Sequence, residues 1–156
     1  MERGSDIHTN NEDALRLACE RGHLEVVKYL VEQGADIRIL SDTPFRCASA
    51  NGHLEIVKYL VEHGANIHTQ NDLALTHVCY AGHLQIVKYL LEQGADVHVR
   101  NDCALRFAVK FGHLEIVKYL VDQGANIYEV IGADLRDAEV NGHLEIVKYL
   151  RSLRNF

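Results

Sequence analysis

The sequence GHLEIVKYL at residues 52–60 occurs five times in the chain, with at most one residue changed in any copy. Its copies are spaced by thirty residues, and their opening glycines are Gly22, Gly52, Gly82, Gly112 and Gly142. A fixed period of this length is typical of a solenoid, in which each unit buries its apolar face against its neighbours. We therefore expect an array of five similar units.

Each unit reads as two short helices joined by a tight turn. In the second copy, Thr43 is a suitable N-cap and Pro44 suits the first turn, and the helix is expected to stop near Gly52. A second helix is predicted at about residues 54–62, where Leu54, Val57, Leu60 and Val61 form an apolar stripe. Isolated helices shorter than about 12 to 15 residues are marginal in water, so these helices require stacking.

An Asn- and Asp-rich connector at residues 65–72 completes the unit, with Asn71 or Asp72 as a replacement cap for the next helix. We expect an N-terminal arm or partial connector at residues 1–12 and a C-terminal cap at residues 151–156. The repeats are placed between them, at residues 13–42, 43–72, 73–102, 103–132 and 133–150.

Composition narrows the class of protein. The chain has 156 residues, of which 47% are hydrophobic, and its net charge is -6. No apolar run is long enough to span a membrane, and the first residues do not resemble a secretory signal. An acidic chain is also a poor partner for nucleic acid. We therefore expect a cytoplasmic protein that contacts neither membranes nor nucleic acids.

The four cysteines form no C-x-x-C pair and occupy repeat positions that Ala, Ser, Val, Thr or other residues hold in other copies. Free cysteine packs as a small hydrophobe, so we interpret them as reduced core residues. They are Cys19, Cys47, Cys79 and Cys103.

The unit resembles an ankyrin repeat. The similarity lies in the opening at residues 43–46, the turn and second helix at 52–57, and the helix exit at 64–67. It implies an all-α solenoid of helix-turn-helix units that binds a partner protein through its concave groove and connector tips, with no enzymatic activity and no cofactor. The thirty-residue period and the sequence VKYLVE of the repeats resemble in particular the ankyrin arrays of giant DNA viruses of amoebae. This resemblance implies a host protein as partner. An artificial scaffold built from such repeats is an open alternative.

Two departures from the ankyrin pattern affect the interpretation. The period is thirty residues rather than the family's usual thirty-three, which indicates shortened hairpin connectors that project less. The opening motif lacks histidine in all five copies, so the family's Thr-to-His hydrogen bond is not expected here.

Three columns of residues keep the period and are interpreted as structural. The lysines of the second helices follow a glutamate by three residues in four copies, so we expect local ion pairs rather than a nucleic-acid surface. The tyrosines are expected to cover the neighbouring repeat, and the histidines to hold the turn. The ankyrin resemblance implies that histidines of successive repeats lie too far apart for two of them to come within about 2.1 Å of one zinc ion. The columns begin at Lys28, Tyr29 and His23.

A fourth column holds arginine in every copy but one, where Thr76 replaces it. Pairing with nearby aspartates favours a structural role for these arginines, and capture of an acidic partner is the alternative. The arginines are Arg16, Arg46, Arg106 and Arg136, and the aspartates are Asp13, Asp42, Asp102 and Asp134.

Residues that break the period are free to specify a partner. Tyr80 and Phe111, with Lys110 and His77 nearby, are expected to form an aromatic cluster of the kind that dominates protein interfaces. The alternative is that both rings pack on the adjacent connector. Connector residues with apolar side chains, Leu40, Val99, Val130 and Ile131, are expected to be largely exposed. The candidate partner-binding residues are Arg38, Leu40, His68, Gln70, His77, Tyr80, His98, Arg100, Lys110, Phe111 and Tyr128.

The two ends of the array differ. In the last repeat, polar Asp137, Glu139 and Arg151 stand at places that hold apolar residues in earlier copies, and Arg154 replaces the helix-closing glycine. These changes predict a wetted cap and an array that ends at Phe156. Residues 4–8 match a connector without a preceding helix. The first helix pair therefore needs cover, either from the N-terminal arm or from a second molecule, and a monomer is the first expectation.

No nucleophile, base and orienting group converge in this pattern, because the histidines and carboxylates recur with the period. We therefore predict a non-enzymatic protein-binding module. The alternative is a structural or self-associating array with no specific partner.

Overall fold

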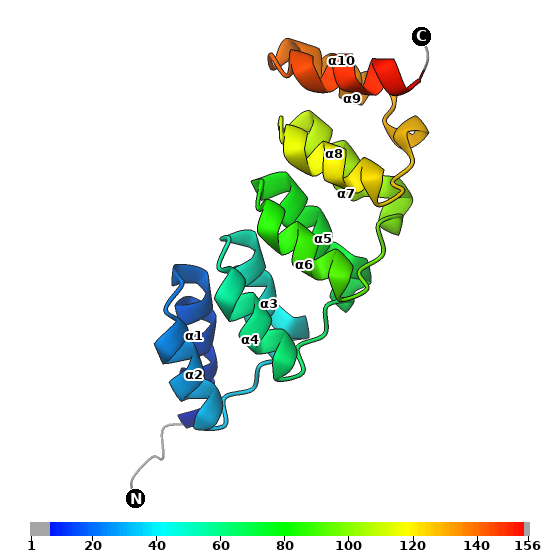
Figure 1. Cartoon of the computed structure of the whole chain (residues 1–156). Helices are drawn as coiled ribbons and strands as arrows, with labels where there is room; N and C mark the ends of the chain where they lie inside the picture. Colours follow the sequence, from blue (N-terminus) through cyan, green and yellow to red (C-terminus); the bar gives the residue numbers. More distant parts are fainter. Residues whose placement is uncertain (1–6, 155–156) are drawn as a thin grey trace, which may run out of the picture. The chain divides into compact units, whose positions relative to one another are not determined.

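The computed structural model of the chain describes residues 7–154. Within that range it contains ten α-helices and one 3-10 helix, and no strand (Figure 1). The all-α, helix-turn-helix fold class is therefore confirmed. The chain divides into two compact units, residues 1–70 and 71–156, which are described in turn.

Unit 1 contains two helix pairs. The helices of each pair lie side by side, and α3 packs against α1. Their bounds are α1 (Ile7–Arg21), α2 (Leu24–Glu32), α3 (Ile39–Ala50) and α4 (Leu54–Glu62). Because α1 begins at Ile7, residues 7–12, which the sequence assigned to an arm or connector, are helical; residues 1–6 of that arm lie outside the described range.

Unit 2 contains three helix pairs, the first of which begins at the boundary with unit 1. The connector before α9 contains the 3-10 helix η1. The elements are α5 (Thr69–Ala81), α6 (Leu84–Glu92), α7 (Val99–Lys110), α8 (Leu114–Asp122), η1 (Ile127–Glu129), α9 (Gly132–Val140) and α10 (Leu144–Leu153).

The second helices bury one apolar stripe against the first helices. In α4 the buried members are Ile56, Val57 and Leu60, while Leu54 and Val61, also expected in the stripe, are half-buried. The same three places are buried in α6, α8 and α10. Helix α4 has the bounds that its sequence predicted, because an apolar stripe and a closing glycine are local signals.

Two of the repeated histidines, His53 and His113, link their turns to the preceding repeat. His53 Nε2 donates a hydrogen bond to the Glu20 carbonyl at 3.0 Å, and its ring covers Gly22. His113 Nε2 likewise donates to the Tyr80 carbonyl at 2.8 Å and covers Gly82. These contacts support the structural interpretation of the histidine column.

Three connectors contain a run of three left-handed residues immediately before the first helix continues. In the second repeat these are Leu40, Ser41 and Asp42, with φ of 48°, 59° and 58°. Equivalent runs lie at residues 70–72 and 100–102. Left-handed non-glycine residues normally occur singly, at a cost of about 1–2 kcal/mol each. Other contacts must therefore stabilise these runs.

The aspartate that ends each left-handed run supplies such a contact. Asp42 is 5% exposed, and its carboxylate accepts hydrogen bonds from Asn66 N at 3.0 Å and Thr69 Oγ1 at 2.6 Å, both in the following connector. Asp102 accepts from Asn126 N at 2.8 Å in the same way. A buried aspartate thus joins successive connectors.

The expected N-cap at Thr43 is not formed, because its Oγ1 donates to the Leu40 carbonyl at 2.8 Å rather than accepting a backbone N–H. The fourth connector lacks the aspartate, having Gly132 at that place, and it also lacks the left-handed run. The left-handed run therefore occurs in the connectors that contain the aspartate and is missing from the connector that lacks it.

Two of the four connector residues with apolar side chains are not exposed as the sequence predicted. Leu40 and Ile131 are 75% and 51% exposed, but Val99 and Val130 are 8% and 0% exposed. The prediction was wrong for these two valines, which are buried. Near Val130, Arg154 Nη2 donates to the carbonyls of Val130, at 2.7 Å, and Ile127.

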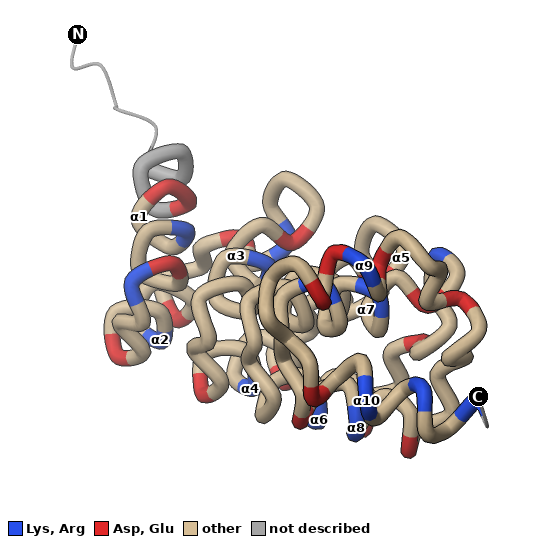
Figure 2. The backbone as a smooth tube through the Cα atoms, turned by 90° about the horizontal axis from the view of Figure 1, so that it is seen from above, with Lys and Arg blue, Asp and Glu red and all other residues tan. Residues whose placement is uncertain are grey.

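The lysine column is paired locally, as predicted. Lys and Arg recur along α6, α8 and α10 in unit 2 (Figure 2). Lys118 and Lys148 each bond the glutamate three residues earlier, at 2.9 and 2.8 Å. Lys88, which follows a glutamine, instead lies over the Tyr119 ring at 5.4 Å.

The arginine column pairs with aspartate at two of the predicted places. Arg16 lies 3.8 Å from Asp13, and Arg106 bonds Asp134 at 2.9 Å. Arg46 does not contribute such a bond through Nε, which is buried without a hydrogen-bond partner. Asp42 and Asp102 instead accept bonds from the next connector, which the sequence did not predict.

The four cysteines are free, and we predict that they are slow to react in the native protein. Burial raises the pKa of Cys19 to about 12 and also raises the pKa of Cys79, Cys47 and Cys103. Only the thiolate attacks, so at pH 8 we expect fully buried Cys79 to be alkylated on the order of tenfold more slowly than half-buried Cys103. Reactivity should rise only as the pH approaches the raised pKa values.

An iodoacetamide pulse followed by peptide mass spectrometry measures this order. The chain unfolded in guanidinium is the control, in which all four thiols should react alike. Faster labelling of Cys79 than of Cys103 in the native protein would contradict the prediction.

Candidate protein-binding site

An exposed aromatic cluster lies on the first helices of unit 2. Tyr80, at the end of α5, meets Phe111, just after α7, with ring centroids 4.4 Å apart and planes at 74°. Phe107 joins them, 6.2 Å from Tyr80 and 6.1 Å from Phe111. Tyr80 is 51% exposed and Phe111 38%. The rings therefore pack on one another, not on the connector, and offer an amphipathic surface to a partner.

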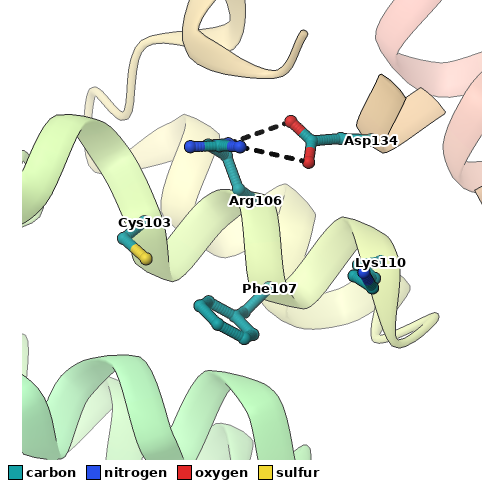
Figure 3. A pocket seen from close by; sticks show the side chains of 5 residues that line it. All are labelled: Cys103, Arg106, Phe107, Lys110 and Asp134. Carbon is teal, nitrogen blue, oxygen red and sulfur yellow. Dashed lines mark hydrogen bonds and ion pairs between the residues drawn. The ribbon is translucent and has the colours of Figure 1, made fainter. Parts of the chain in front are cut away.

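Two pockets flank Phe107. The larger, with a volume of about 300 Å³, lies between α5 and α7 and is lined by Leu73, Thr76, His77, Tyr80, Arg100, Cys103 and Phe107. The smaller, of about 170 Å³, lies on the other side of α7 and is lined by Cys103, Arg106, Phe107, Lys110 and Asp134. Figure 3 shows Arg106 and Phe107 leaving α7 in different directions, Arg106 towards Asp134 and Phe107 towards the third repeat.

The cations beside the cluster are held by aspartates of the last repeat. Arg106 donates to both Asp134 oxygens, at 2.9 and 3.4 Å, and this hydrogen bond raises its pKa above the ordinary value. Lys110 Nζ lies 3.0 Å from Asp137. These pairs fix the positions of both cations along the rim of the smaller pocket.

The structure brings together five of the residues that the sequence singled out. His77, Tyr80 and Arg100 line the larger pocket, Lys110 lines the smaller one, and Phe111 completes the cluster. His98 and Tyr128 are exposed elsewhere in unit 2: His98 bonds Asp102 at 3.1 Å, and Arg154 lies 5.7 Å from the Tyr128 ring.

The remaining candidates belong to unit 1 and do not line these pockets. Arg38 Nε donates to the Gly64 carbonyl at 2.9 Å, which gives this residue a structural contact. Leu40, His68 and Gln70 are exposed on their connectors.

Sequence reasoning missed Phe107, Thr76 and Cys103 as parts of the site. A signal for Phe107 was available, because the residue at its place in the repeat changes in every copy: Leu17, Cys47, His77, Phe107 and Asp137. Thr76 was noticed only as a gap in the arginine column. Its position in a pocket depends on how α5 and α7 pack.

Among residues 7–154, no three His, Cys, Asp or Glu side chains are grouped so that they could hold a metal ion. None of the described helices is long and apolar enough to cross a bilayer.

Comparison with known families agrees with the architecture. The family model described as ankyrin repeats (3 copies) matches residues 1–71 and 67–130. The chain therefore belongs to the ankyrin-repeat family, whose members are generally protein–protein interaction modules and typically non-enzymatic. None of the curated proteins matches the chain.

Proposed function

We propose that this protein is a non-enzymatic binding module that holds a partner protein against the aromatic cluster of unit 2. The observation that carries the proposal is the half-exposed pair Tyr80 and Phe111, packed edge to face on adjacent repeats with Phe107 beside them. Large aromatic side chains at the centre of an interface supply much of its binding energy. A rigid cluster also loses little conformational entropy when a partner binds.

The connector residues extend this proposal to the rim of the interface. Exposed His98 and Tyr128 in unit 2 are proposed as further contacts there. In unit 1, taken by itself, the proposed partner contacts are Arg38, Leu40, His68 and Gln70. Rim contacts contribute less to affinity than buried aromatic anchors. A host protein in the cytoplasm as partner rests on the similarity of the repeats to viral ankyrin arrays.

Affinity capture from cell lysate tests the proposal. The variant Tyr80→Ala, Lys110→Ala, Phe111→Ala is expected to lose its partner, with at least one of these changes costing more than about 2 kcal/mol of binding energy. The matched control is Tyr29→Ala, which removes an exposed tyrosine outside the cluster, on α2, and should retain the partner. Circular dichroism confirms that both variants fold. Identical proteins captured by the triple variant and the parent would refute this site.

Self-association is a second candidate function, favoured by an observation in unit 1. Ile56 of α4 is 1% exposed because the preceding repeat covers it, but Val26, at the same place in α2, is 47% exposed. Leu17 and Tyr29 are exposed as well, at 37% and 60%. In this candidate, the apolar face of the first repeat pairs with a second copy.

Size-exclusion chromatography with light scattering distinguishes the candidates. Self-association predicts a dimer whose mass returns to that of a monomer in Val26→Lys, because a buried unpaired charge opposes the contact. A monomer at the highest attainable concentration removes this candidate and leaves the first.

A further inference from the structure

The pocket beside Thr76 is larger than the pocket at the equivalent place of the next repeat, where Arg106 replaces Thr76. Between the fourth and fifth repeats, Arg106 reaches Asp134 and the remaining pocket has a volume of about 170 Å³. Between the third and fourth repeats, Thr76 holds the equivalent place and the pocket measures about 300 Å³. The larger of these two pockets is thus the one lined by the shorter side chain.

The hydroxyl of Thr76 has an unmet hydrogen-bonding capacity. Thr76 is 4% exposed, and its Oγ1 is buried without a hydrogen-bond partner. A threonine within a helix usually bonds the carbonyl four residues earlier. That residue is Asp72, which is left-handed (φ 50°) and so lies outside the right-handed turn. A ligand that bonds this hydroxyl would satisfy a buried polar group.

The walls of the larger pocket suit an aromatic ring. Tyr80 and Phe107 present rings whose planes differ by 79°, and Leu73 adds an aliphatic surface. Aromatic rings prefer such edge-to-face and offset neighbours. The pocket volume of about 300 Å³ lies at the low end of ligand sites, roughly 300–1,000 Å³, which favours a single side chain over an extended ligand.

The charges along this surface favour an acidic segment around that side chain. Arg100 lines the larger pocket, and Arg106 and Lys110 line the adjoining one, where Asp134 and Asp137 are their counterions. Arginine and lysine side chains therefore line both pockets, although the whole chain has a net charge of -6. Complementary charge at an interface selects the partner and its orientation.

We propose that the larger pocket receives a tyrosine side chain from an acidic segment of the partner protein. The phenol ring lies against Tyr80 and Phe107, and its hydroxyl forms a hydrogen bond with Thr76. Acidic residues on either side of the tyrosine face Arg100 and Lys110. This inference rests on the proposed protein-binding function and defines the chemistry of its anchor.

Nuclear magnetic resonance titration of the full chain with three blocked pentapeptides tests the inference. The peptides are Glu-Glu-Tyr-Glu-Glu, Glu-Glu-Phe-Glu-Glu and Lys-Lys-Tyr-Lys-Lys. We expect the first to shift the amide signals of Thr76, Tyr80 and Phe107, and to bind roughly fivefold more tightly than the phenylalanine peptide, which lacks the hydroxyl. The lysine peptide should bind more weakly still.

Two substitutions of Thr76 distinguish the contribution of its hydroxyl from that of the pocket volume. Thr76→Val keeps the shape and should abolish the preference for tyrosine over phenylalanine. Thr76→Arg introduces the residue that the other four repeats have at this place, so the variant should fold. The longer side chain should fill the pocket and abolish binding of every peptide. Gln93→Arg adds the same charge at an exposed place in the third repeat and is the matched control.

The outcomes separate this inference from the proposed function. Equal affinity for the tyrosine and phenylalanine peptides, undiminished binding to Thr76→Arg, a tighter lysine peptide, or no response at millimolar peptide each overturns the inference. If the triple variant at Tyr80, Lys110 and Phe111 still loses a captured partner, the proposed function stands without it. If that variant retains every partner, the proposed function itself fails.

Discussion

Replacing Gly82 with alanine is expected to lower the free energy of unfolding by about 3–5 kcal/mol. Two terms contribute. Gly82 has a φ of +87°, which alanine adopts only with strain. The new Cβ would also stand 2.6 Å from Cε1 of His113, so the imidazole must move. Its 2.8 Å hydrogen bond to the Tyr80 carbonyl is then lost.

Gly94 and Gly142 provide matched controls. Both have positive φ, +94° and +82°, but no heavy atom of the described residues lies within 4 Å of a Cβ placed there. Alanine at either position should therefore cost only the backbone term, about 1–2 kcal/mol. Urea unfolding at fixed temperature, extrapolated linearly, gives these differences.

A double-mutant cycle isolates the steric term. His113→Ala removes the ring that a Cβ at Gly82 would strike, so the two changes together should cost less than the sum of each alone. We expect a coupling energy of about 1–3 kcal/mol, as for residues in direct contact. Equal losses for Gly82→Ala and Gly94→Ala, with no coupling to His113, would show that the histidine does not hold this turn.

The second large effect is expected at Asp42, where alanine should cost about 3–4 kcal/mol. The change leaves the Asn66 N–H without its acceptor, and it leaves the Thr69 hydroxyl with only the Asn66 carbonyl, at 2.9 Å. Alanine must also adopt a φ of 58°, which aspartate and asparagine tolerate better. Loss of this residue should loosen the junction between successive connectors of unit 1.

Asp42→Asn is the informative intermediate, because it keeps one acceptor oxygen and the tolerance for positive φ. It should cost about half as much as alanine, roughly 1–2 kcal/mol. Asp13→Ala serves as the surface control. The Asp13 side chain is 74% exposed, and its ion pair with Arg16 is long, at 3.8 Å. We expect that control to change stability by less than about 0.5 kcal/mol. An Asp42→Ala variant as stable as the Asp13→Ala variant would rule out this role.

The second helices were predictable from sequence almost residue for residue. Helix α4 has the bounds 54–62 that its apolar stripe indicated, because stripe and closing glycine lie within one short segment. The connectors were not predictable to the same degree. Their left-handed runs depend on Asp42 reaching Asn66, a residue 24 positions away in the next connector.

The candidate site was predictable in part. Tyr80, Phe111 and Lys110 were identified because they break the period at the end of a first helix. The burial of Thr76 was not, since it follows from the packing of α5 against α7 and from the left-handed residue four positions before it. The exposure of Val99 and Val130 was predicted wrongly for a related reason: whether a connector side chain is buried depends on where its backbone turns.

The sequence by itself determined the number of repeats, the helix pair in each and the residues that vary between them. Period, apolar spacing and turn residues are local properties, and each copy reports them independently. Only the tertiary structure decided which variable residues meet, that an aspartate joins successive connectors, and that Thr76 lies in a pocket with an unsatisfied hydroxyl. These features arise from contacts between neighbouring repeats, where one side chain's length sets the space left for another.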